Sequence, residues 1–356
     1  MSAPSNYQAI LERSLKTFMP DRGAGSTTPV VNTVGGILGV YAGGTVGYLP
    51  FGLQSLGGAA VTQATRFELA SVTKTFTAAL LGEQPALFSA AVSQSLNKIS
   101  SDYSLTAMGQ QITFEELATF SGGFPDDTQN NPVNPPTQDN FVAYVNALSP
   151  SQLPAPYAYS NDSFGFLGQV LMGLQGYDIK QFGQGTPMLD DWYSANITGP
   201  KQLQMSSTST SAAGSEMAIG YSYGNGVYTP HPPFPWAPWG AAGALRSSAE
   251  DMMIYVQAYL GVTQIGGISV PPALTAGMQA AIQPTSFSAP DGNKMGFGWV
   301  VTPKGIVFKD GGHVGFSSWV GLVPASQIGL VILVNTGGNP VGDVGLYILN
   351  AMLNGG

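Results

Sequence analysis

Strand-like patterns lie at both ends of this 356-residue chain, and helical patterns fill the middle. Residues 34–51 predict two strands joined at Gly43-Gly44, a pair that suits a tight hairpin. Four more short strands are predicted near the C-terminus, over residues 295–303, 306–311, 316–324 and 328–335. Strands joined by short turns pair antiparallel. The chain is therefore predicted to form one antiparallel sheet to which both ends contribute.

Helical patterns accompany the strands at both ends. An amphipathic helix is predicted over residues 5–18, capped by Ser5 or Asn6 and ended by Pro20. Further helices are predicted over residues 71–81, from a capping box at Ser247-Ser248-Ala249-Glu250 to Leu260, and over residues 341–353. These helices are expected to flank the sheet, because an apolar sheet face must be buried against another layer.

The middle of the chain has no strand pattern. Residues 81–204 look helical, with surface loops such as the Pro-, Asn- and Asp-rich segment 125–139. The predicted fold class is therefore α+β, with a discontinuous sheet domain (1–80 and 205–356) and an inserted, mainly helical domain (81–204). An active site is expected in the cleft between the two domains.

The composition excludes several classes of function. The chain has no cysteine, which excludes disulfides, thiol catalysis and thiolate metal sites. Its only histidines are His231 and His313, whereas zinc sites usually take three or four His or Cys ligands. No metal and no cofactor are therefore predicted. The net charge of −8 argues against nucleic acid as a partner, because binding to a phosphate backbone needs a basic surface.

No segment is predicted to cross a membrane, because none approaches the roughly 18 apolar residues that a span needs. The N-terminus lacks the charged segment and apolar core of a signal peptide. The chain is therefore either cytoplasmic or has lost a signal. A cysteine-free composition with only 9% charged residues is compatible with an exported bacterial protein. On this ground a periplasmic or secreted location is favoured over the cytoplasm.

Ser71-Val72-Thr73-Lys74 is the first candidate for chemistry. On a helix, positions three residues apart share one face, which brings the Lys74 amine to the Ser71 hydroxyl. A serine becomes a good nucleophile when a base takes its proton, and a buried lysine can be that base. Ser95-Leu96-Asn97-Lys98 has the same spacing but lies in a polar stretch. It is interpreted as a solvated helix face.

Tyr159-Ser160-Asn161 is the second candidate. A tyrosine beside a cation loses its proton more easily and can act as base or acid, and an asparagine amide can hold a substrate carbonyl. The same spacing occurs at Tyr144-Val145-Asn146 and Tyr223-Gly224-Asn225. Tyr159 differs from these because it lies in a Pro-rich loop just before an apolar run, whereas Tyr144 falls in an amphipathic helix pattern typical of a core residue.

Lys309-Asp310-Gly311-Gly312 is the third candidate, on a predicted strand that ends in glycines. Gly311 and Gly312 would let a substrate backbone approach and leave N–H groups available to it. The alternative is a solvated strand lysine followed by a turn.

The order of these elements resembles the serine hydrolases of the class C β-lactamase and penicillin-binding-protein family, including its Ser-x-x-Lys esterases. The spacings of 88 residues (159 − 71) and 150 residues (309 − 159) are similar to that family. Other landmarks occur in the same order: Phe67-Glu-Leu-Ala-Ser-Val-Thr-Lys74, Ser121-Gly-Gly-Phe-Pro125, Ala242-Gly-Ala-Leu-Arg-Ser-Ser-Ala-Glu-Asp251, Gly296-Phe-Gly-Trp299 and Gly315-Phe316, with Pro324 and Asn335. The resemblance covers residues 34 to 353.

The resemblance implies a role for each candidate residue. Ser71 would attack and become acylated, with Lys74 and Tyr159 moving its proton. Asn161 would hold the substrate near its carbonyl, and Lys309 would support Tyr159 and bind substrate. The backbone N–H groups of Ser71 and Gly312 would form the oxyanion hole.

Two positions depart from the family pattern. The middle of the Lys-x-Gly element is usually a hydroxyl residue in β-lactamases, and here it is Asp310. Asn339-Pro340-Val341-Gly342 resembles the segment that offers an Asn and an Arg to the substrate carboxylate; Asn339 is kept, but Gly342 stands at the Arg position. The Asp310 carboxylate would repel a substrate carboxylate unless it points away or pairs with Lys309, and the missing Arg also weakens recognition of an anion. These two changes argue against an efficient β-lactamase or carboxypeptidase and favour a neutral ester or amide, although the sequence does not choose among a carboxylic ester, a β-lactam and a D-amino-acid peptide as substrate.

Three further readings complete the prediction. His313 follows the strand motif and is expected to line the site. The Pro-rich loop from Trp236 to Trp239 is a candidate wall for an apolar acyl pocket. The segment Gly220-Tyr221-Ser222-Tyr223-Gly224 fits the nucleophile elbow of α/β-hydrolases, but the prolines that follow cannot start the required helix, so it is interpreted as a loop.

The non-enzymatic alternative is a catalytically weak penicillin-binding or sensor module of the same fold.

Overall fold

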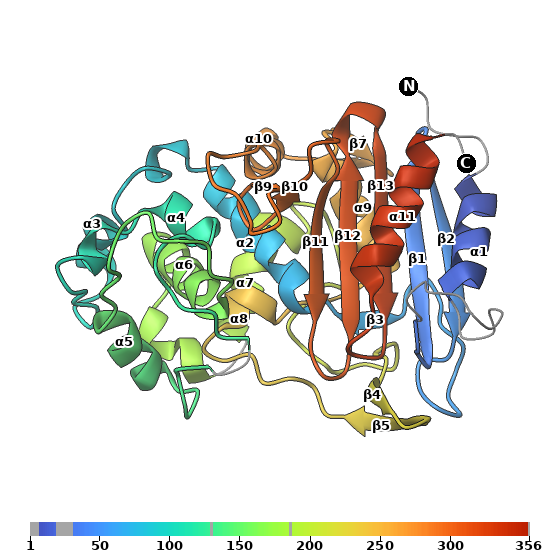
Figure 1. The fold of residues 1–356 in the computed structure, drawn as a ribbon, viewed down its shortest axis with the longest axis horizontal. Coiled ribbons are helices and arrows are strands. Elements are labelled where there is room, and N and C mark those ends of the chain that lie inside the picture. The colour runs from blue at the N-terminus through green and yellow to red at the C-terminus, as the bar shows by residue number, and fades with distance from the viewer. Residues whose placement is uncertain (1–6, 19–30, 129–130, 185–186, 355–356) are drawn as a thin grey trace.

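A computed structural model describes residues 7–18, 31–128, 131–184 and 187–354 (Figure 1). Its main feature is a seven-stranded sheet in the order β2-β1-β13-β12-β11-β10-β9. The strands are β1 (Gly35–Ala42), β2 (Thr45–Gly52), β9 (Lys294–Met295), β10 (Val300–Val301), β11 (Val307–Gly312), β12 (Ser317–Val323) and β13 (Ile328–Val334). All neighbouring strands are antiparallel.

Both ends of the chain contribute to this sheet, as predicted. β1 pairs with β2 on one side and with β13 on the other, where Gly36 lies opposite Val334. The hairpin turns at Gly43 and Gly44, whose φ angles of 60° and 79° lie in the left-handed region that glycine adopts without strain. The α+β fold class is thereby confirmed.

Helices cover both faces of the sheet, which explains why β12 and β13 are buried at every position. Helices α1 (Tyr7–Phe18) and α11 (Val341–Leu353) contact each other on one face, and α9 (Ala249–Tyr259) contacts β1 and β13 on the other (Figure 1). Side chains of β13 alternate between the two layers: Ile332 packs in the cluster that includes α11, and Leu333 packs in the larger cluster on the opposite face.

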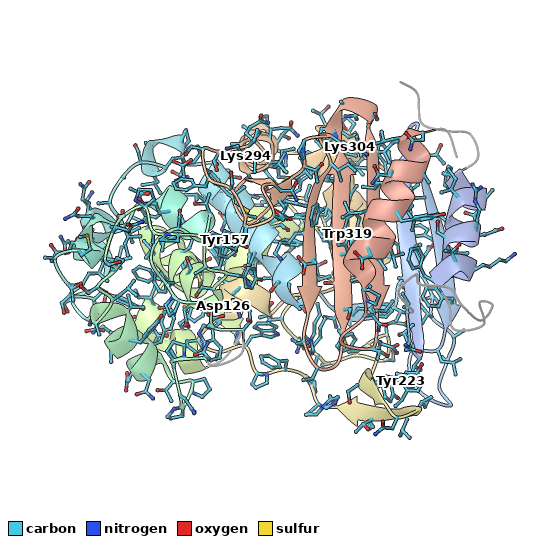
Figure 2. All side chains as sticks on the ribbon, in the orientation of Figure 1. Asp126, Tyr157, Tyr223, Lys294, Lys304 and Trp319 are labelled. Carbon is cyan, nitrogen blue, oxygen red and sulfur yellow. The ribbon has the colours of Figure 1, made fainter. Side chains whose placement is uncertain are left out.

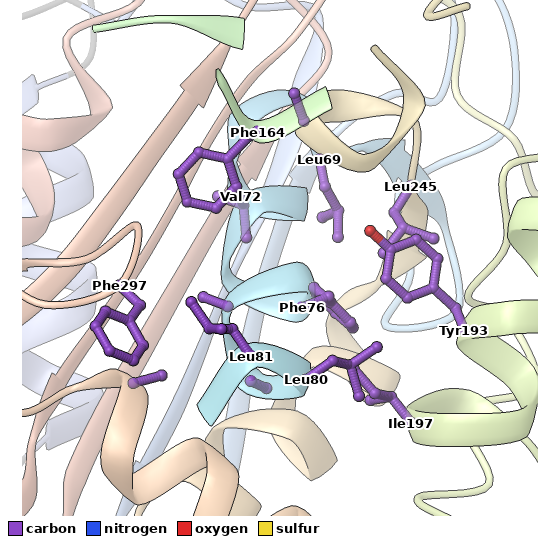
Figure 3. Packing of buried hydrophobic residues seen from close by; sticks show 14 of the residues in the cluster. Leu69, Val72, Phe76, Leu80, Leu81, Phe164, Tyr193, Ile197, Leu245 and Phe297 are labelled. Carbon is purple, nitrogen blue, oxygen red and sulfur yellow. The ribbon is translucent and has the colours of Figure 1, made fainter. Parts of the chain in front are cut away.

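A second group of helices stands beside the sheet (Figure 1). It comprises α3 (Val92–Ile99), α4 (Phe114–Ala118), α5 (Gln138–Asn146), α6 (Asn161–Leu174) and α7 (Pro187–Tyr193). Helix α2 (Thr73–Gly82) lies between this group and the sheet, and every one of its residues is buried. Apolar side chains lie around it, among them Phe164 and Tyr193 from the helical group and Phe297, and α2 itself contributes Phe76 to the same cluster (Figure 3). The domain boundaries at residues 80 and 204 stay predictions.

The remaining elements are short. They are α8 (Gly240–Gly243), α10 (Pro272–Ala281) and the strand pairs β3 (Arg66–Glu68) with β6 (Arg246–Ser248), β4 (Gly220–Gly224) with β5 (Val227–His231), and β7 (Gln264–Ile265) with β8 (Ile268–Ser269). Among the residues that the structure describes, no helix is long and apolar enough to span a bilayer.

Three predicted elements need correction. The strand expected over residues 295–303 is split into β9 and β10, because the chain leaves the ladder at Gly298, which has φ of 68°. The capping box is displaced by one residue: Ser248 is the N-cap of α9 and accepts from the Asp251 N–H at 3.2 Å. The segment 220–224 is a strand of a hairpin rather than a loop, and no helix follows it as a nucleophile elbow would require.

Smaller differences concern helix starts. The helix predicted from Ser71 begins as a 3₁₀ turn, Ala70–Val72, and becomes α-helical at Thr73. Helix α1 is confirmed over residues 7–18. The capping residues Ser5 and Asn6 and the predicted stop at Pro20 lie outside the described residues.

Candidate active site

Ser71 lies on the 3₁₀ turn that connects β3 to α2, with 8% of its surface exposed. The residue before it, Ala70, has φ of 45°, a left-handed conformation that costs a non-glycine residue free energy. This turn lies between the end of β3 at Glu68 and the start of α2 at Thr73. The serine is thereby presented at the junction between the sheet and the helical group.

Lys74 is fully buried beneath Ser71. Its Nζ lies 3.0 Å from Ser71 Oγ, 2.7 Å from Asn161 Oδ1 and 3.0 Å from the Ala242 carbonyl oxygen. Burial lowers the pKa of Lys74, and the charge of Lys309 lowers it further, although Tyr159 opposes the shift. A neutral amine would donate to Asn161 and Ala242 and keep its lone pair for the Ser71 proton. The geometry therefore suits a general base.

The Tyr159 hydroxyl lies 2.6 Å from Ser71 Oγ on the other side. Two ammonium groups flank its ring: Lys74 Nζ is 4.9 Å and Lys309 Nζ 5.1 Å from the ring centroid. Burial raises the pKa of Tyr159, but the charges of Lys309 and Lys74 outweigh burial, and the net pKa is lowered. Tyr159 can thus exchange a proton with Ser71 more easily than an ordinary tyrosine.

The amine of Lys309 binds the residue that follows it, Asp310. Its Nζ donates to the Asp310 carbonyl oxygen at 2.7 Å and pairs with Asp310 Oδ1 at 3.0 Å. Burial lowers the pKa of Lys309, but Asp310 and Tyr159 raise it more strongly, so the net pKa is raised and the amine stays charged. Lys309 conversely lowers the pKa of Asp310. Both groups are therefore ionised and form a pair at the edge of the site.

The end of β11 runs directly beside Ser71. A side chain at Gly311 would clash with the Leu69 carbonyl oxygen and come within 3.0 Å of Ser71 N, so only glycine fits. His313 N donates to Phe316 O at 3.1 Å. Because hydrogen-bonded and non-hydrogen-bonded pairs alternate along an antiparallel ladder, the Gly312 N–H turns away from β12. It is therefore available on the edge of β11 next to Ser71, where the predicted oxyanion hole would lie.

Two cavities meet at Ser71, Tyr159 and Gly312. The first has a volume of about 390 Å³ and an apolar wall made by Phe234, Trp236, Trp239 and Val314, with His313 also lining it. The second, of about 440 Å³, extends along Lys309 and Asp310 toward Met295 and Tyr157; Tyr157 lies where the helical group meets the sheet (Figure 2). The Trp236–Trp239 loop thus does wall the site. A larger cavity of about 640 Å³ is lined by residues between 190 and 209 and touches none of the candidates.

Asn161 is held in a way that the sequence does not predict. Its Oδ1 accepts from Lys74, and its Nδ2 donates to Asp127 Oδ1 at 3.0 Å. Asp127, 5% exposed, also accepts from the Ser160 hydroxyl at 3.0 Å and the Asp162 N–H at 2.7 Å. The Asn161 amide therefore orients Lys74 through Oδ1 and is fixed by Asp127 through Nδ2, while the residue also lines the first cavity.

Asp127 is the residue that sequence reasoning missed. It lies in the segment 125–139, whose prolines, asparagines and aspartates predict a surface loop. No pattern in that segment distinguishes a buried aspartate from the solvated ones around it. The sequence marks it only as the second of two aspartates, Asp126 and Asp127, that directly follow the Ser121–Pro125 landmark.

Asp162 forms a second buried carboxylate beside Asp127. It is fully buried, and its Oδ1 accepts from the Trp239 indole N–H. Burial and the charge of Asp127 raise the pKa of Asp162 to about 7. Since an unfolded aspartate has a pKa of about 3.9, the stability gained from the neutral form is fully present below about pH 4 and is lost as pH rises to about 7.

Asp162→Asn is expected to remove this pH-dependent loss. The amide keeps an acceptor for Trp239 and carries no charge, so the variant should unfold with a free energy about 1–3 kcal/mol higher than wild type at pH 8. Urea unfolding between pH 4 and 8 measures the difference. Equal pH slopes for the two proteins would show that folding does not raise the pKa of Asp162.

The structure does not bring Asn339 into the site. Its Oδ1 accepts from the Asn32 N–H at 2.7 Å, and its Nδ2 donates to the carbonyl oxygens of Asn32 and Thr336 at 2.9 and 3.0 Å. These bonds use its amide to join two backbone segments. The prediction that Asn339 binds substrate is therefore wrong for this conformation, and Gly342 on α11 supplies no side chain in its place.

The rival motifs lie elsewhere. Ser95 lies on α3 and is buried, contrary to the prediction of a solvated face, while Lys98 is exposed. Tyr144 packs against Phe124 with ring centroids 6.1 Å apart, as expected of a core residue. Tyr223 lies on β4, in the hairpin at the edge of the molecule (Figure 2). In the described part of the chain, no cluster of three His, Asp or Glu side chains is arranged to hold a metal ion.

Comparisons with known proteins agree with this architecture. A family model described as Beta-lactamase matches residues 28–351. A β-lactamase of Escherichia coli (strain K12) is 27% identical over 331 residues, which cover 82% of this chain and 81% of the relative. A β-lactamase of Pseudomonas fluorescens is 25% identical over 324 residues, which cover 77% of this chain and 80% of the relative.

The fold gives the same result. The crystal structure of a class C β-lactamase from Rhodobacter sphaeroides matches with a TM-score of 0.76 at 21% identity, over 98% of this chain and 99% of that one. A family match over most of the chain, together with this fold and the arrangement of Ser71 and Lys74, leads to one conclusion. The chain belongs to the β-lactamase family of serine hydrolases.

Proposed function

We propose that this protein hydrolyses an ester or amide that carries no carboxylate beside the scissile bond, through an acyl-enzyme on Ser71. The observation that carries the proposal is the ion pair between Lys309 and Asp310, 3.0 Å apart. The ammonium that would otherwise attract a substrate carboxylate is already paired with the Asp310 carboxylate, so the two groups together offer no net positive charge to an anion.

The geometry supports each chemical step. Ser71 Oγ attacks the carbonyl carbon while its proton passes to Lys74 Nζ or the Tyr159 oxygen, both within 3.0 Å. The oxyanion accepts hydrogen bonds from the N–H groups of Ser71 and Gly312. The bond to the leaving group then breaks, the leaving oxygen or nitrogen takes the proton, and Ser71 is left esterified. Water then attacks the acyl carbonyl by the same steps, which releases the acid and regenerates Ser71.

The lining of the first cavity supports an apolar acyl group. Phe234, Trp236 and Trp239 contribute three aromatic side chains to its wall, and the segment from residue 217 to 245 contains no Asp, Glu, Lys or Arg. Burial of an aromatic or aliphatic group against such a wall is favourable by about 25 cal/mol for each Å² removed from water.

We propose the periplasm or the cell exterior as the location, on the ground of the cysteine-free, charge-poor composition.

The test compares p-nitrophenyl esters with penicillin on wild type and Asp310→Asn. Wild type should hydrolyse the ester with a much higher kcat/KM than penicillin. Asp310→Asn frees Lys309 for a carboxylate, so the ratio of penicillin to ester kcat/KM should rise about tenfold, which corresponds to about 1.4 kcal/mol. Efficient penicillin turnover by wild type would contradict the proposal. A lasting penicillin adduct without turnover of either compound would instead identify a penicillin-binding or sensor module.

A further inference from the structure

A buried carboxylate below the first cavity joins three segments of the chain. Glu68, 1% exposed, pairs through Oε1 with Arg246 Nη2 at 2.6 Å and through Oε2 with His313 Nε2 at 2.6 Å. Its Oε1 also lies 3.4 Å from the Phe234 N–H. We call Glu68, Arg246 and His313 the Glu68 clamp. None of the steps described above uses it.

The clamp is an ionised, specific arrangement. Burial raises the pKa of Glu68, but the contact with His313 and the charge of Arg246 outweigh burial and lower it, so the carboxylate stays charged. A buried charge of this kind is stable only while its partners remain in place. Arg246 is itself fixed, because it also donates to the Thr210 carbonyl oxygen.

The tautomer of His313 follows from its two contacts. Nδ1 accepts from the Gly315 N–H at 3.2 Å, so the proton of the neutral ring is on Nε2, which faces Glu68. The ring also packs against Phe234 and Phe316, with centroids 5.3 and 5.6 Å away. The Gly315 hydrogen bond, the close contact of Nε2 with Glu68 and the packing of two aromatic rings together hold the imidazole in place.

The positions of these residues along the chain connect the clamp to catalysis. Glu68 ends β3 three residues before Ser71, and His313 directly follows Gly312 at the end of β11. The Ser318 hydroxyl also donates to the Leu69 carbonyl oxygen at 2.6 Å, which fixes β12 to the segment between β3 and Ser71. The clamp therefore bridges the two segments that carry the oxyanion-hole N–H groups.

We propose that Glu68 and His313 are positioning residues that set the separation of the Ser71 and Gly312 N–H donors. This inference rests on the proposed acyl-enzyme mechanism. It adds to that mechanism the residues that fix the distance between the two N–H donors of the oxyanion hole. An oxyanion hole acts only when its donors are aimed at the oxygen of the transition state. Loss of the clamp should therefore weaken catalysis without removing any group that touches the substrate carbonyl.

The experiment compares an activated oxoester with the matching thionoester, in which sulfur replaces the carbonyl oxygen. Sulfur is a weaker hydrogen-bond acceptor, so the thionoester depends less on the oxyanion hole. In His313→Ala the kcat for the oxoester should fall about 10- to 100-fold, less than the loss expected from removing a donor outright. The KM should change little, and the ratio of oxoester to thionoester kcat should fall by a similar factor. His313→Gln restores a donor toward Glu68 and should recover part of the loss.

The other histidine provides the matched control. His231 contacts Ser222 at 2.9 Å on the β4–β5 hairpin and lies outside both cavities, so His231→Ala should match wild type in kcat and in the ratio. A higher KM with unchanged ratio in both His313 variants would show that His313 contacts substrate directly and would overturn the proposal. If His313→Ala does not fold, His313→Gln carries the test. Wild-type turnover of the oxoester tests the proposed function separately, because its failure would appear before any variant is compared.

Discussion

Ser71→Ala is expected to lower the kcat for ester hydrolysis by about 10⁴- to 10⁶-fold, since loss of a serine nucleophile removes the covalent route. The fold should survive. Only one buried hydroxyl is lost, and its removal leaves Lys74 and Tyr159 each without one hydrogen-bond partner, at a cost of about 1–3 kcal/mol. Steady-state turnover and thermal unfolding of the two proteins measure both effects.

The second Ser-x-x-Lys element offers a matched control. Ser95 is also a buried serine that begins such a motif, but it lies on α3, outside both cavities that meet at Ser71. Ser95→Ala should therefore retain wild-type turnover. Activity that survives in Ser71→Ala would move the nucleophile to another residue.

Lys74→Met is expected to slow acylation of Ser71 by about 10²- to 10⁴-fold, the usual contribution of a general base. Methionine fills most of the space of the lysine, so the change removes the amine without opening a large cavity. Rapid-quench measurement of the acylation step isolates the effect. Lys98→Met changes the exposed lysine of the second motif and should leave the rate unchanged.

The pH dependence of acylation provides an independent check on Lys74 and Tyr159. The pKa of each group is lowered, so the deprotonated form that accepts the Ser71 proton becomes populated at a lower pH than for an ordinary lysine or tyrosine, near 10. The wild-type rate should rise with pH and level off below that value. An effect of less than about tenfold in Lys74→Met, with the same pH profile, would show that Lys74 is structural.

Much of the fold follows from periodicity alone. The hairpin around Gly43-Gly44 and the strands at residues 317–323 and 328–334 have clear apolar patterns bounded by turn residues. Strand β9–β10 was mispredicted because its continuous apolar pattern conceals the positive φ of Gly298, which only packing against α2 and α6 imposes: a side chain there would meet Phe164.

The sequence predicts the candidate site where the chemistry lies in local motifs. The prediction fails where the position of a side chain depends on distant contacts. Ser71 and Lys74 are brought together by one helical turn, so their spacing in the sequence suffices. The orientation of Asn161 depends on Asp127, 34 residues away in a loop without regular structure. Asn339 has the expected place in the chain, but its amide is bound to Asn32, 307 residues away.

The central claim, that Ser71 is acylated by a substrate without a carboxylate, is tested most directly by intact-protein mass. Wild type and Ser71→Ala are mixed with excess p-nitrophenyl ester or penicillin and quenched in acid within the first turnovers. We expect the mass of one acyl group on wild type with the ester, located by peptide mapping to Ser71, and no adduct on Ser71→Ala. An acyl group that persists on Ser71→Ala, or labelling of wild type by penicillin but not by the ester, would contradict the claim.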